Sequence, residues 1–208
     1  LSKLKESYSF SGISYSFSFT PKTSTYEYQL LFLNGGRRAL FLDRDGVLNV
    51  DTGYVGKESN LQVLFDFCPV IKKCNDLGVP VIVLTNQAGV GRGYFSEDDV
   101  KSVNEKLRKA FLQKNARIDD FFTSFSHPNG ITPYDYDSIY RKPMEGMLAK
   151  AVEKFGIDSS LCLMVGDKVS DNFGSSIGRF CLLESKYHQG GQSTKLILEK
   201  IFEWLRSF

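Results

Sequence analysis

Five short strand-like runs, separated by longer segments with helical periodicity, set the pattern of the chain after residue 38. They cover residues 39–42, 79–84, 120–125, 161–165 and 180–183. The first run is apolar without alternation, which is typical of a central parallel strand covered on both faces. The second is too short for a helix and rich in β-branched residues. We therefore predict five strands.

Helices are predicted between these strands and at the end of the chain. One ends near Leu77, where Gly78 supplies a C-terminal stop. The others are a helix to about residue 114 after a capping box at residues 96–99, one over residues 144–155 that closes at Gly156, a more polar one through residues 173–176 and an amphipathic one over residues 193–208.

Alternating strands and helices indicate parallel βαβ units, whose right-handed crossovers place the strand ends at one edge of the sheet. The predicted fold class is α/β. We expect a Rossmann-like, doubly wound and mostly parallel sheet with helices on both faces.

The first 37 residues differ from the rest, being rich in Ser, Tyr and Phe. Residues 13–19 alternate between apolar side chains and serine, which is the period of a half-buried strand. A turn signal at residues 20–24 and a second strand-like run at residues 26–33 follow. We predict a strand-rich extension over residues 1–37, forming a hairpin at the edge of the main domain or the tail of a preceding one. The main domain is predicted over residues 38–208.

The charge balance gives no reason to expect a nucleic-acid partner. Lysine and arginine number 26 against 24 aspartates and glutamates, and no basic stripe is present. No apolar run reaches the ~20 residues that a membrane helix needs. We expect a protein that binds neither nucleic acid nor membrane and that is a monomer or a weak oligomer.

The four cysteines lie singly within apolar segments and form no Cys-x-x-Cys pair. This distribution favours reduced thiols in the core of a cytoplasmic protein over disulfides or a zinc site. The first residue is Leu1. We take this to indicate a processed chain or a part of a longer one.

Polar side chains gather where the predicted strands end. They are Asp43 and Asp45 after the first strand, Thr85 and Asn86 after the second, Asp167 and Asp171 after the fourth, and Lys142 from an intervening loop. Ligands of open α/β sheets bind at the carboxyl ends of the strands. These side chains are therefore predicted to converge on one site.

Three converging carboxylates would repel one another unless a cation lay among them, and oxygen ligands suit Mg²⁺, which usually takes a phosphate oxygen as well. Thr85 offers a hydroxyl and Lys142 a positive charge for that phosphate. An ionised Asp43 could attack phosphorus, and Asp45 could then act as the acid and later the base. The expected substrate is a small phosphate ester.

Five ordered motifs carry a resemblance to a known family. They are Asp43-Arg44-Asp45-Gly46-Val47-Leu48-Asn49, Gly53-Tyr54-Val55, Thr85-Asn86-Gln87 with the glycine-rich run to Gly93, Arg141-Lys142-Pro143 and Val165-Gly166-Asp167-Lys168. Together they resemble the haloacid dehalogenase-like phosphatases. Within that family the match is to the small, cap-poor branch that contains heptose 1,7-bisphosphate and histidinol-phosphate phosphatases.

The resemblance implies a role for each matched residue. Asp43 would be the nucleophile and Asp45 the acid and base, with Thr85 and Lys142 holding the phosphate. Mg²⁺ would be held by Asp43, the backbone carbonyl of Asp45, and Asp167. Asn86 and Arg141 look like substrate-orienting residues, and Asp171 would steady Lys168 or a metal-bound water.

One departure from the family concerns zinc. Relatives often carry four zinc ligands before Arg-Lys-Pro, and the corresponding positions here are Ser124, Ser126, Ser138 and Tyr140. None of these is a good zinc ligand. A single imidazole, His127, remains nearby. No bound zinc is expected, and His127 is interpreted as a loop or substrate contact.

Two arginines bear on substrate choice. Arg92 and Arg141 both lie in loops expected at the mouth of the site, and two guanidinium groups suit a second phosphate. The predicted function is a Mg²⁺-dependent phosphomonoesterase of carbohydrate metabolism, acting on heptose 1,7-bisphosphate at its 7-phosphate. Histidinol phosphate stays open as the alternative substrate, as does a non-catalytic phosphate-binding domain of a larger chain; a phosphatase of nucleic-acid ends is disfavoured.

Overall fold

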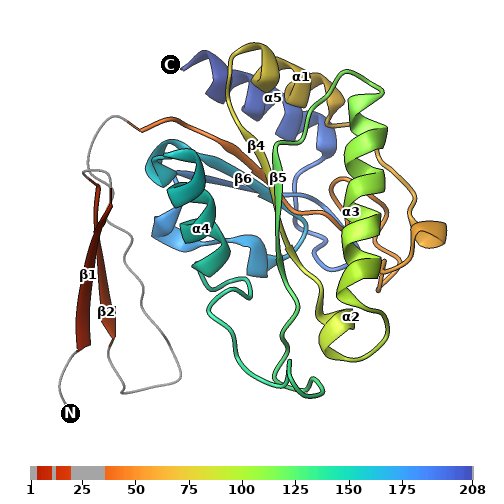
Figure 1. Cartoon of the computed structure of the whole chain (residues 1–208). Helices are drawn as coiled ribbons and strands as arrows, with labels where there is room; N and C mark the ends of the chain where they lie inside the picture. Colours follow the sequence, from red (N-terminus) through yellow and green to blue (C-terminus); the bar gives the residue numbers. More distant parts are fainter. Residues whose placement is uncertain (1–3, 11–12, 20–35, 208) are drawn as a thin grey trace.

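The computed structural model describes residues 4–10, 13–19 and 36–207 (Figure 1). The strands are β1 (Leu4–Phe10), β2 (Ile13–Phe19), β3 (Leu40–Leu42), β4 (Val81–Asn86), β5 (Asp120–Ser124), β6 (Leu163–Gly166) and β7 (Arg179–Leu182). The helices are α1 (Cys68–Asp76), α2 (Ala88–Gly91), α3 (Glu97–Leu112), α4 (Gly146–Phe155) and α5 (Thr194–Arg206). Short 3₁₀ turns lie at η1 (Glu58–Asn60), η2 (Ser159–Leu161), η3 (Val169–Asp171) and η4 (Gly174–Ser176).

The main sheet has five parallel strands in the order β5-β4-β3-β6-β7. The first strand of the domain, β3, is therefore the central one, with β4 on one side and β6 on the other. Because these three strands run in the same direction, the residues that follow each of them meet at one edge. The predicted fold class is confirmed, and the five predicted strands are all present.

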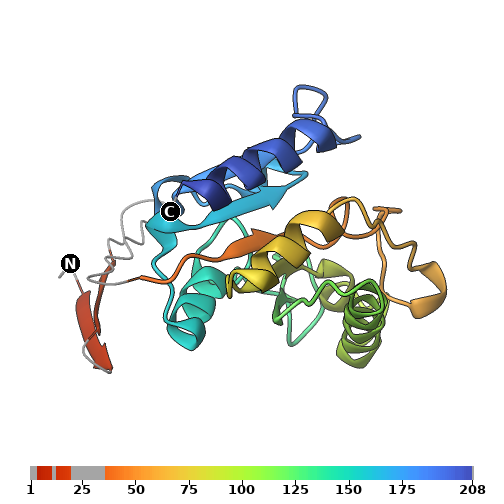
Figure 2. The ribbon, with the colours of Figure 1, turned by 90° about the horizontal axis from the view of Figure 1, so that it is seen from above.

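Helices cover both faces of this sheet because neighbouring strand residues point to opposite sides. Leu40 and Leu42 pack with α1, α3 and α5 on one face, while Phe41 packs with α4 on the other. The helices α1 and α5 lie side by side over the first face (Figure 2). The run of residues 39–42 reads as continuously apolar because both of its faces are buried.

The predicted ends of two helices are confirmed in detail. α3 begins with a capping box, in which the Ser96 hydroxyl accepts from the Asp99 backbone N–H and the Asp99 carboxylate accepts from the Ser96 backbone N–H. α4 ends at Gly156, whose φ of 59° lies in the left-handed region. These local signals fix helix boundaries without help from the rest of the fold.

The helix predicted after Asp171 is wrong. The chain between β6 and β7 contains only the 3₁₀ turns η3 and η4. Gly174 has a φ of 58°, which interrupts any α-helix at this point, and the segment offers only Phe173 and Ile177 to the core. A short crossover is sufficient because β6 and β7 are neighbours in the sheet.

The strand predicted over residues 13–19 is confirmed as β2, while its predicted pairing with residues 26–33 stays a prediction. β2 pairs antiparallel with β1, a strand that the sequence interpretation missed. The turn at residues 20–24 and the strand at residues 26–33 lie outside the described residues. Neither β1 nor β2 joins the five-stranded sheet. The division into units at residue 37 stays a prediction.

Two composition-based expectations can be compared with the structure. All four cysteines are free thiols, and Cys74, Cys162 and Cys181 are buried. Among the described residues, no helix has the length and apolar character required to cross a bilayer.

The α3 cap gives a first prediction. Ser96→Ala removes the hydroxyl of the capping box, so the free energy of unfolding should fall by roughly 0.5–2 kcal/mol. This corresponds to a Tm lower by about 2–4 °C per kcal/mol for a chain of this size. Thermal unfolding followed by circular dichroism measures it. Ser102→Ala, an exposed position within the same helix, is the matched control, and an equal fall in both variants would show that the cap is not responsible.

Candidate active site

Two carboxylates lie at the ends of neighbouring strands. Asp43 follows β3 directly, and its backbone N–H donates to the Val165 carbonyl of β6 at 2.9 Å. Asp167 follows β6. Gly46 then turns the chain with a φ of 86°, and a Cβ at this position would come within 2.3 Å of an Asp167 carboxylate oxygen. Glycine is needed here for its conformation and for the close approach to Asp167.

The carboxylates of Asp43, Asp167 and Asp171 form a compact buried cluster. One oxygen from each lies within 4.8 Å of the others, and this is the one group of potential metal-ligating side chains found among the described residues. No hydrogen-bond donor reaches either oxygen of Asp167. Its nearest cation is the Lys168 ammonium, 4.0 Å from Oδ1. Buried acceptors without donors leave room for a cation.

Burial makes Asp43 and Asp167 reluctant to ionise. Burial, with a smaller effect of the Asp171 and Asp45 carboxylates, raises the pKa of Asp43 to about 7, although the Lys142 ammonium acts to lower it. Burial likewise raises the pKa of Asp167 to about 6. Hard oxygen ligands of this kind suit Mg²⁺, and a bound dication would favour their ionised forms. The residues present therefore fit a magnesium ion.

Lys142 supplies the positive charge of the cluster. Its Nζ lies 2.8 Å from Asp43 Oδ1, 2.6 Å from Asp171 Oδ1 and 2.7 Å from the Leu84 carbonyl. Burial alone would lower the pKa of Lys142, but the two carboxylates outweigh burial and raise it. The ammonium is therefore charged and fixed in place.

Asn86 holds Lys142 through the backbone. Its Nδ2 donates to the Lys142 carbonyl, and its Oδ1 accepts from the Lys142 N–H, both at 3.0 Å. Asp171, which forms an ion pair with Lys142, also binds the backbone of Lys168: its Oδ2 accepts from the Lys168 N–H at 3.0 Å. The expected contact between Asp171 and Lys168 is thus present through the backbone, and the Asp171 ion pair with Lys142 was not foreseen.

Donors on every side hold the carboxylate of Asp45. Its Oδ1 accepts from Arg44 and from Asn49 Nδ2, the latter at 2.9 Å. Its Oδ2 accepts from Gln87 Nε2 at 2.7 Å and from Arg44 Nη2 at 3.1 Å. Gln87 Nε2 also donates to the Thr85 hydroxyl at 2.9 Å. Gln87 therefore connects Asp45 with Thr85.

A polar cavity of about 240 Å³ opens beside these residues. Of the predicted site residues, it is lined by Asp43, Asp45, Asn86, Arg141, Lys142, Lys168 and Asp171. Thr85, Arg92 and Asp167 do not line it, although Thr85 and Asp167 contact or adjoin residues that do. The predicted convergence of strand ends is therefore present in the structure, with Arg92 farther out.

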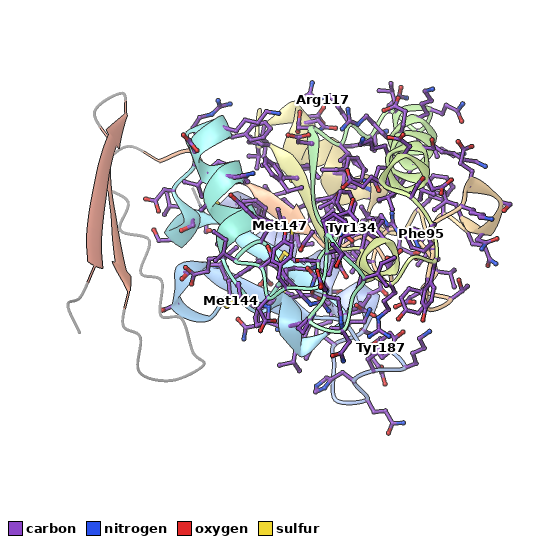
Figure 3. The ribbon with its side chains drawn as sticks, turned by 60° about the horizontal axis from the view of Figure 1, so that its bottom comes forward. Phe95, Arg117, Tyr134, Met144, Met147 and Tyr187 are labelled. Carbon is purple, nitrogen blue, oxygen red and sulfur yellow. The ribbon has the colours of Figure 1, made fainter. Side chains whose placement is uncertain are left out.

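The mouth of the cavity carries a second charged group. Asp51, almost fully buried, accepts from Lys168 Nζ at 2.9 Å and lies 3.7 Å from the Lys186 ammonium. The ring of Tyr187 packs against both ammonium groups, with its centroid 4.3 Å from Lys168 Nζ and 4.9 Å from Lys186 Nζ. Tyr187 is labelled in Figure 3. The hydrogen bond from Lys168 lowers the pKa of Asp51 against the opposing effect of burial, which is the largest single influence.

Phe95 packs between the loop that carries Gly56 and the helix α2, which carries Gly89. Its ring, labelled in Figure 3, lies against Gly56 and Gly89, where an added Cβ would come within 2.0 and 2.1 Å of it. Tyr54 and Tyr94 stack edge to face nearby, with ring centroids 4.8 Å apart. Gly56 in its loop and Gly89 in α2 therefore allow the ring to approach closely.

Arg92, His127 and Arg141 form a cationic cluster. The backbone N–H of Asn129 donates to His127 Nδ1 at 3.0 Å, so the proton of the neutral ring must lie on Nε2. That nitrogen faces Arg92 Nη2 at 3.1 Å, so two donors oppose each other. Burial and the two guanidinium groups lower the pKa of His127. The Asp137 carboxylate acts on the pKa of both His127 and Arg141 in the opposite direction.

Hydrogen bonds and ring packing organise the loop between β5 and Arg141. The Tyr134 hydroxyl donates to Glu97 at 2.6 Å, the His127 N–H donates to the Tyr134 carbonyl, and Arg141 donates to the Ser126 carbonyl at 3.3 Å. Tyr134 is labelled in Figure 3. Ser124, Ser126 and Ser138 are buried in the same region. The expectation that the protein binds no zinc stays a prediction.

Sequence reasoning missed three residues of this site: Arg44, Asp51 and Gln87. Each lies inside a quoted motif or directly beside one, so their positions were signalled. The partners Asn104 and Lys186 were not, because they lie outside the motifs and far from Arg44 and Asp51 in the sequence. Val55 lies inside a motif, but it binds Arg44 through its backbone carbonyl, which no side-chain pattern signals.

Comparison with known proteins identifies the family. The profile described as haloacid dehalogenase-like hydrolase matches residues 33–172. The chain belongs to this family. The match also confirms the predicted resemblance, and the relatives described next confirm the enzyme class, a phosphatase.

Two curated relatives are similar in sequence. D-glycero-alpha-D-manno-heptose-1,7-bisphosphate 7-phosphatase of Burkholderia mallei is 43% identical over 68% of this chain and 76% of its own. D-glycero-beta-D-manno-heptose-1,7-bisphosphate 7-phosphatase of Haemophilus influenzae is 36% identical over 64% of this chain and 73% of its own. The two relatives differ in the anomer that they are named for.

Two solved structures are similar in fold. A putative HAD-like phosphatase from Mesorhizobium loti has a TM-score of 0.75 and 29% identity, covering 84% of this chain and 88% of its own. D,D-heptose 1,7-bisphosphate phosphatase from B. bronchiseptica, in complex with magnesium and phosphate, has a TM-score of 0.63 and 21% identity, covering 78% and 99%. The second likeness concerns the fold alone.

The Asp167 carboxylate, which no hydrogen-bond donor reaches, gives a second prediction. Its pKa is raised from 3.8 to about 6, so its contribution to stability is present at low pH and lost as the pH rises through about 6. In metal-free protein, Asp167→Asn should therefore raise Tm at about pH 8 by a few degrees and much less at about pH 4. Added Mg²⁺ should raise the Tm of the wild type but not of the variant.

Calorimetry with and without EDTA measures both effects. Asp119, whose carboxylate pairs with Arg117 at 2.8 Å away from the cluster, provides the control substitution Asp119→Asn. An equal response of Asp119→Asn to Mg²⁺ and pH would contradict the assignment of the cation to the Asp167 cluster.

Proposed function

We propose that this protein is a Mg²⁺-dependent phosphomonoesterase that removes the 7-phosphate of heptose 1,7-bisphosphate through an aspartyl-phosphate intermediate. The observation that carries the proposal is the buried Asp43 at the end of β3, held at 2.8 Å by Lys142 and adjoined by the donor-free Asp167. Phosphoryl transfer needs positioning and charge neutralisation more than covalent chemistry from the protein. This cluster can provide both.

The proposed magnesium site consists of Asp43, Asp167 and the backbone carbonyl of Asp45. When bound, the ion would neutralise charge on the transferring phosphoryl group and the carboxylates. Asp171 is engaged with Lys142 at 2.6 Å. We therefore give Asp171 the role of fixing the lysine.

In the first step, the Asp43 carboxylate attacks phosphorus and the bond between phosphorus and the C7 oxygen breaks. The Asp45 carboxyl gives its proton to the departing oxygen, so that the sugar leaves as an alcohol. Lys142 and the Thr85 hydroxyl hold the phosphoryl oxygens. Asn86 keeps Lys142 in position through its paired hydrogen bonds.

In the second step, water attacks the aspartyl-phosphate. Asp45, now ionised, takes a proton from that water, and the bond between phosphorus and Asp43 breaks. Inorganic phosphate leaves, Asp43 is again a carboxylate, and Asp45 is again protonated. The sum is hydrolysis of one phosphate ester.

The cationic cluster supports a bisphosphate substrate. Arg92, His127 and Arg141 offer donors that share no hydrogen-bond acceptor among the described residues, and Arg141 lines the cavity. A second phosphate could accept from these groups and remove the opposition between two donors. A substrate carrying an amine, such as histidinol phosphate, would meet repulsion there. The names of the relatives support the same substrate.

Asp43→Asn tests the nucleophile. The amide has the same shape but cannot attack phosphorus, so turnover should fall to background while Tm stays within a few degrees of the wild type. Phosphate release and trapping of the phosphorylated protein after acid quench are the measurements. A variant that keeps near-native turnover would refute the aspartyl-phosphate mechanism.

Arg141→Ala tests the second phosphate. The wild type should prefer heptose 1,7-bisphosphate to heptose 7-phosphate and to histidinol phosphate in kcat/KM. The variant should narrow this preference by about 1–3 kcal/mol, the value of a hydrogen bond to a charged group.

Arg117→Ala is the matched control. In Figure 3, Arg117 lies at the opposite end of the molecule from Tyr187, and it pairs with Asp119. Equal or better hydrolysis of histidinol phosphate by the wild type would overturn the substrate assignment and leave the phosphatase intact.

A further inference from the structure

Arg44, which lies between Asp43 and Asp45 in the sequence, has a fully buried guanidinium group. Arg44 is 0% exposed and does not line the cavity, whereas Asp43 and Asp45 on either side of it do. Arg44 therefore has no contact with the space where a substrate would bind.

A buried guanidinium is costly unless its donors are satisfied, and these donors go to three separate segments. Nη1 donates to Asn104 Oδ1 of α3 at 3.0 Å. Nη2 donates to the Val55 carbonyl at 2.7 Å. Val55 belongs to the loop of residues 50–57, part of which lines the cavity and which is called the mouth loop below. Nε and Nη2 donate to the Asp45 carboxylate at 3.1–3.2 Å. The group thus connects Asp45 to α3 and to the mouth loop.

The two oxygens of Asp45 are held unequally. Oδ1 accepts from Arg44 Nε, Arg44 Nη2 and Asn49 Nδ2. Oδ2 accepts from Arg44 Nη2 and from Gln87 Nε2, and Gln87 in turn reaches Thr85. Oδ1 thus has more contacts, two of them from Arg44, and Oδ2 is the oxygen that Gln87 links to the Thr85 hydroxyl.

We infer that Arg44 is the positioning residue of the acid and base: it anchors Asp45 Oδ1 so that Oδ2 is presented to the leaving oxygen, with Asn104 fixing the guanidinium in turn. The inference rests on the proposed function, since it assigns a partner to the proton donor of that reaction. It also explains why an asparagine, an unfavourable residue within a helix, is buried in the middle of α3.

A substrate series with different leaving groups separates this role from a merely structural one. An alkyl phosphate such as heptose 1,7-bisphosphate needs a proton on its leaving oxygen, whereas 4-nitrophenyl phosphate releases a stable anion and does not. A loss of positioning of Asp45 should lower kcat on the first much more than on the second. A partly unfolded protein would lower both equally.

Arg44→Lys is the principal variant, because it keeps the charge but a single ammonium cannot reach Asp45, Asn104 and Val55 together. We expect kcat on the alkyl phosphate to fall by about ten- to a hundredfold, within the ~10²–10⁴ that acid–base catalysis contributes, and kcat on the aryl phosphate to fall only by about threefold or less. In an Asp45→Asn background the same substitution should have little further effect, since the pair acts as a unit.

Asn104→Ala is the second variant, for the case in which Arg44→Lys does not fold. It should shift the ratio of the two rates in the same direction by a smaller factor, while Ser102→Ala, an exposed position on the same helix, should leave the ratio unchanged. Equal loss on both substrates, or effects of Arg44→Lys and Asp45→Asn that multiply, would overturn the inference. If Asp45→Asn itself does not change the ratio, the proposed acid role fails instead.

Discussion

The buried Lys142 ammonium between Asp43 and Asp171 is the interaction on which the site depends. An ammonium removed from water is stable only with charged partners, and here two carboxylates and one carbonyl provide them. Three clustered carboxylates face this one buried cation. Burial, reinforced by this excess of negative charge, raises the pKa of Asp43 and Asp167. A divalent cation and a phosphate are the partners that such an imbalance favours.

The central position of β3 makes this cluster possible. Because β4 and β6 flank β3 in parallel, Asn86, Asp43 and Asp167 follow three adjacent strands and meet at one edge. Helices on both faces keep water away from the strands, and the residues just beyond their ends share that dry environment. The same burial that stabilises the sheet therefore raises the pKa of Asp43 and Asp167. The chemistry of the site is a consequence of where the strands end.

Groups around the cluster divide into those that hold it and those that face the substrate. Asn86, Asp171 and Arg44 bind other protein groups and fix Lys142 or Asp45. Arg92, His127 and Arg141 instead present donors without a shared acceptor in the described part of the chain. The loop that carries His127 is held by the Tyr134–Glu97 hydrogen bond and by packing. In the proposed function, the first set positions Lys142 and Asp45, and the second set selects the substrate.

The sequence by itself determined the strands, most helix boundaries and the identity of the acids, because continuous apolar runs, the Ser96 cap and the Gly156 stop act locally. It misjudged residues 173–176, where Gly174 adopts a positive φ, and it missed β1 as the partner of β2. It named Asp171 and Arg92 but could not show that Asp171 pairs with Lys142 or that Arg92 opposes His127. Only the tertiary structure decided these contacts, and those of Arg44 with Asn104 and Val55, because each joins segments that local propensity treats as independent.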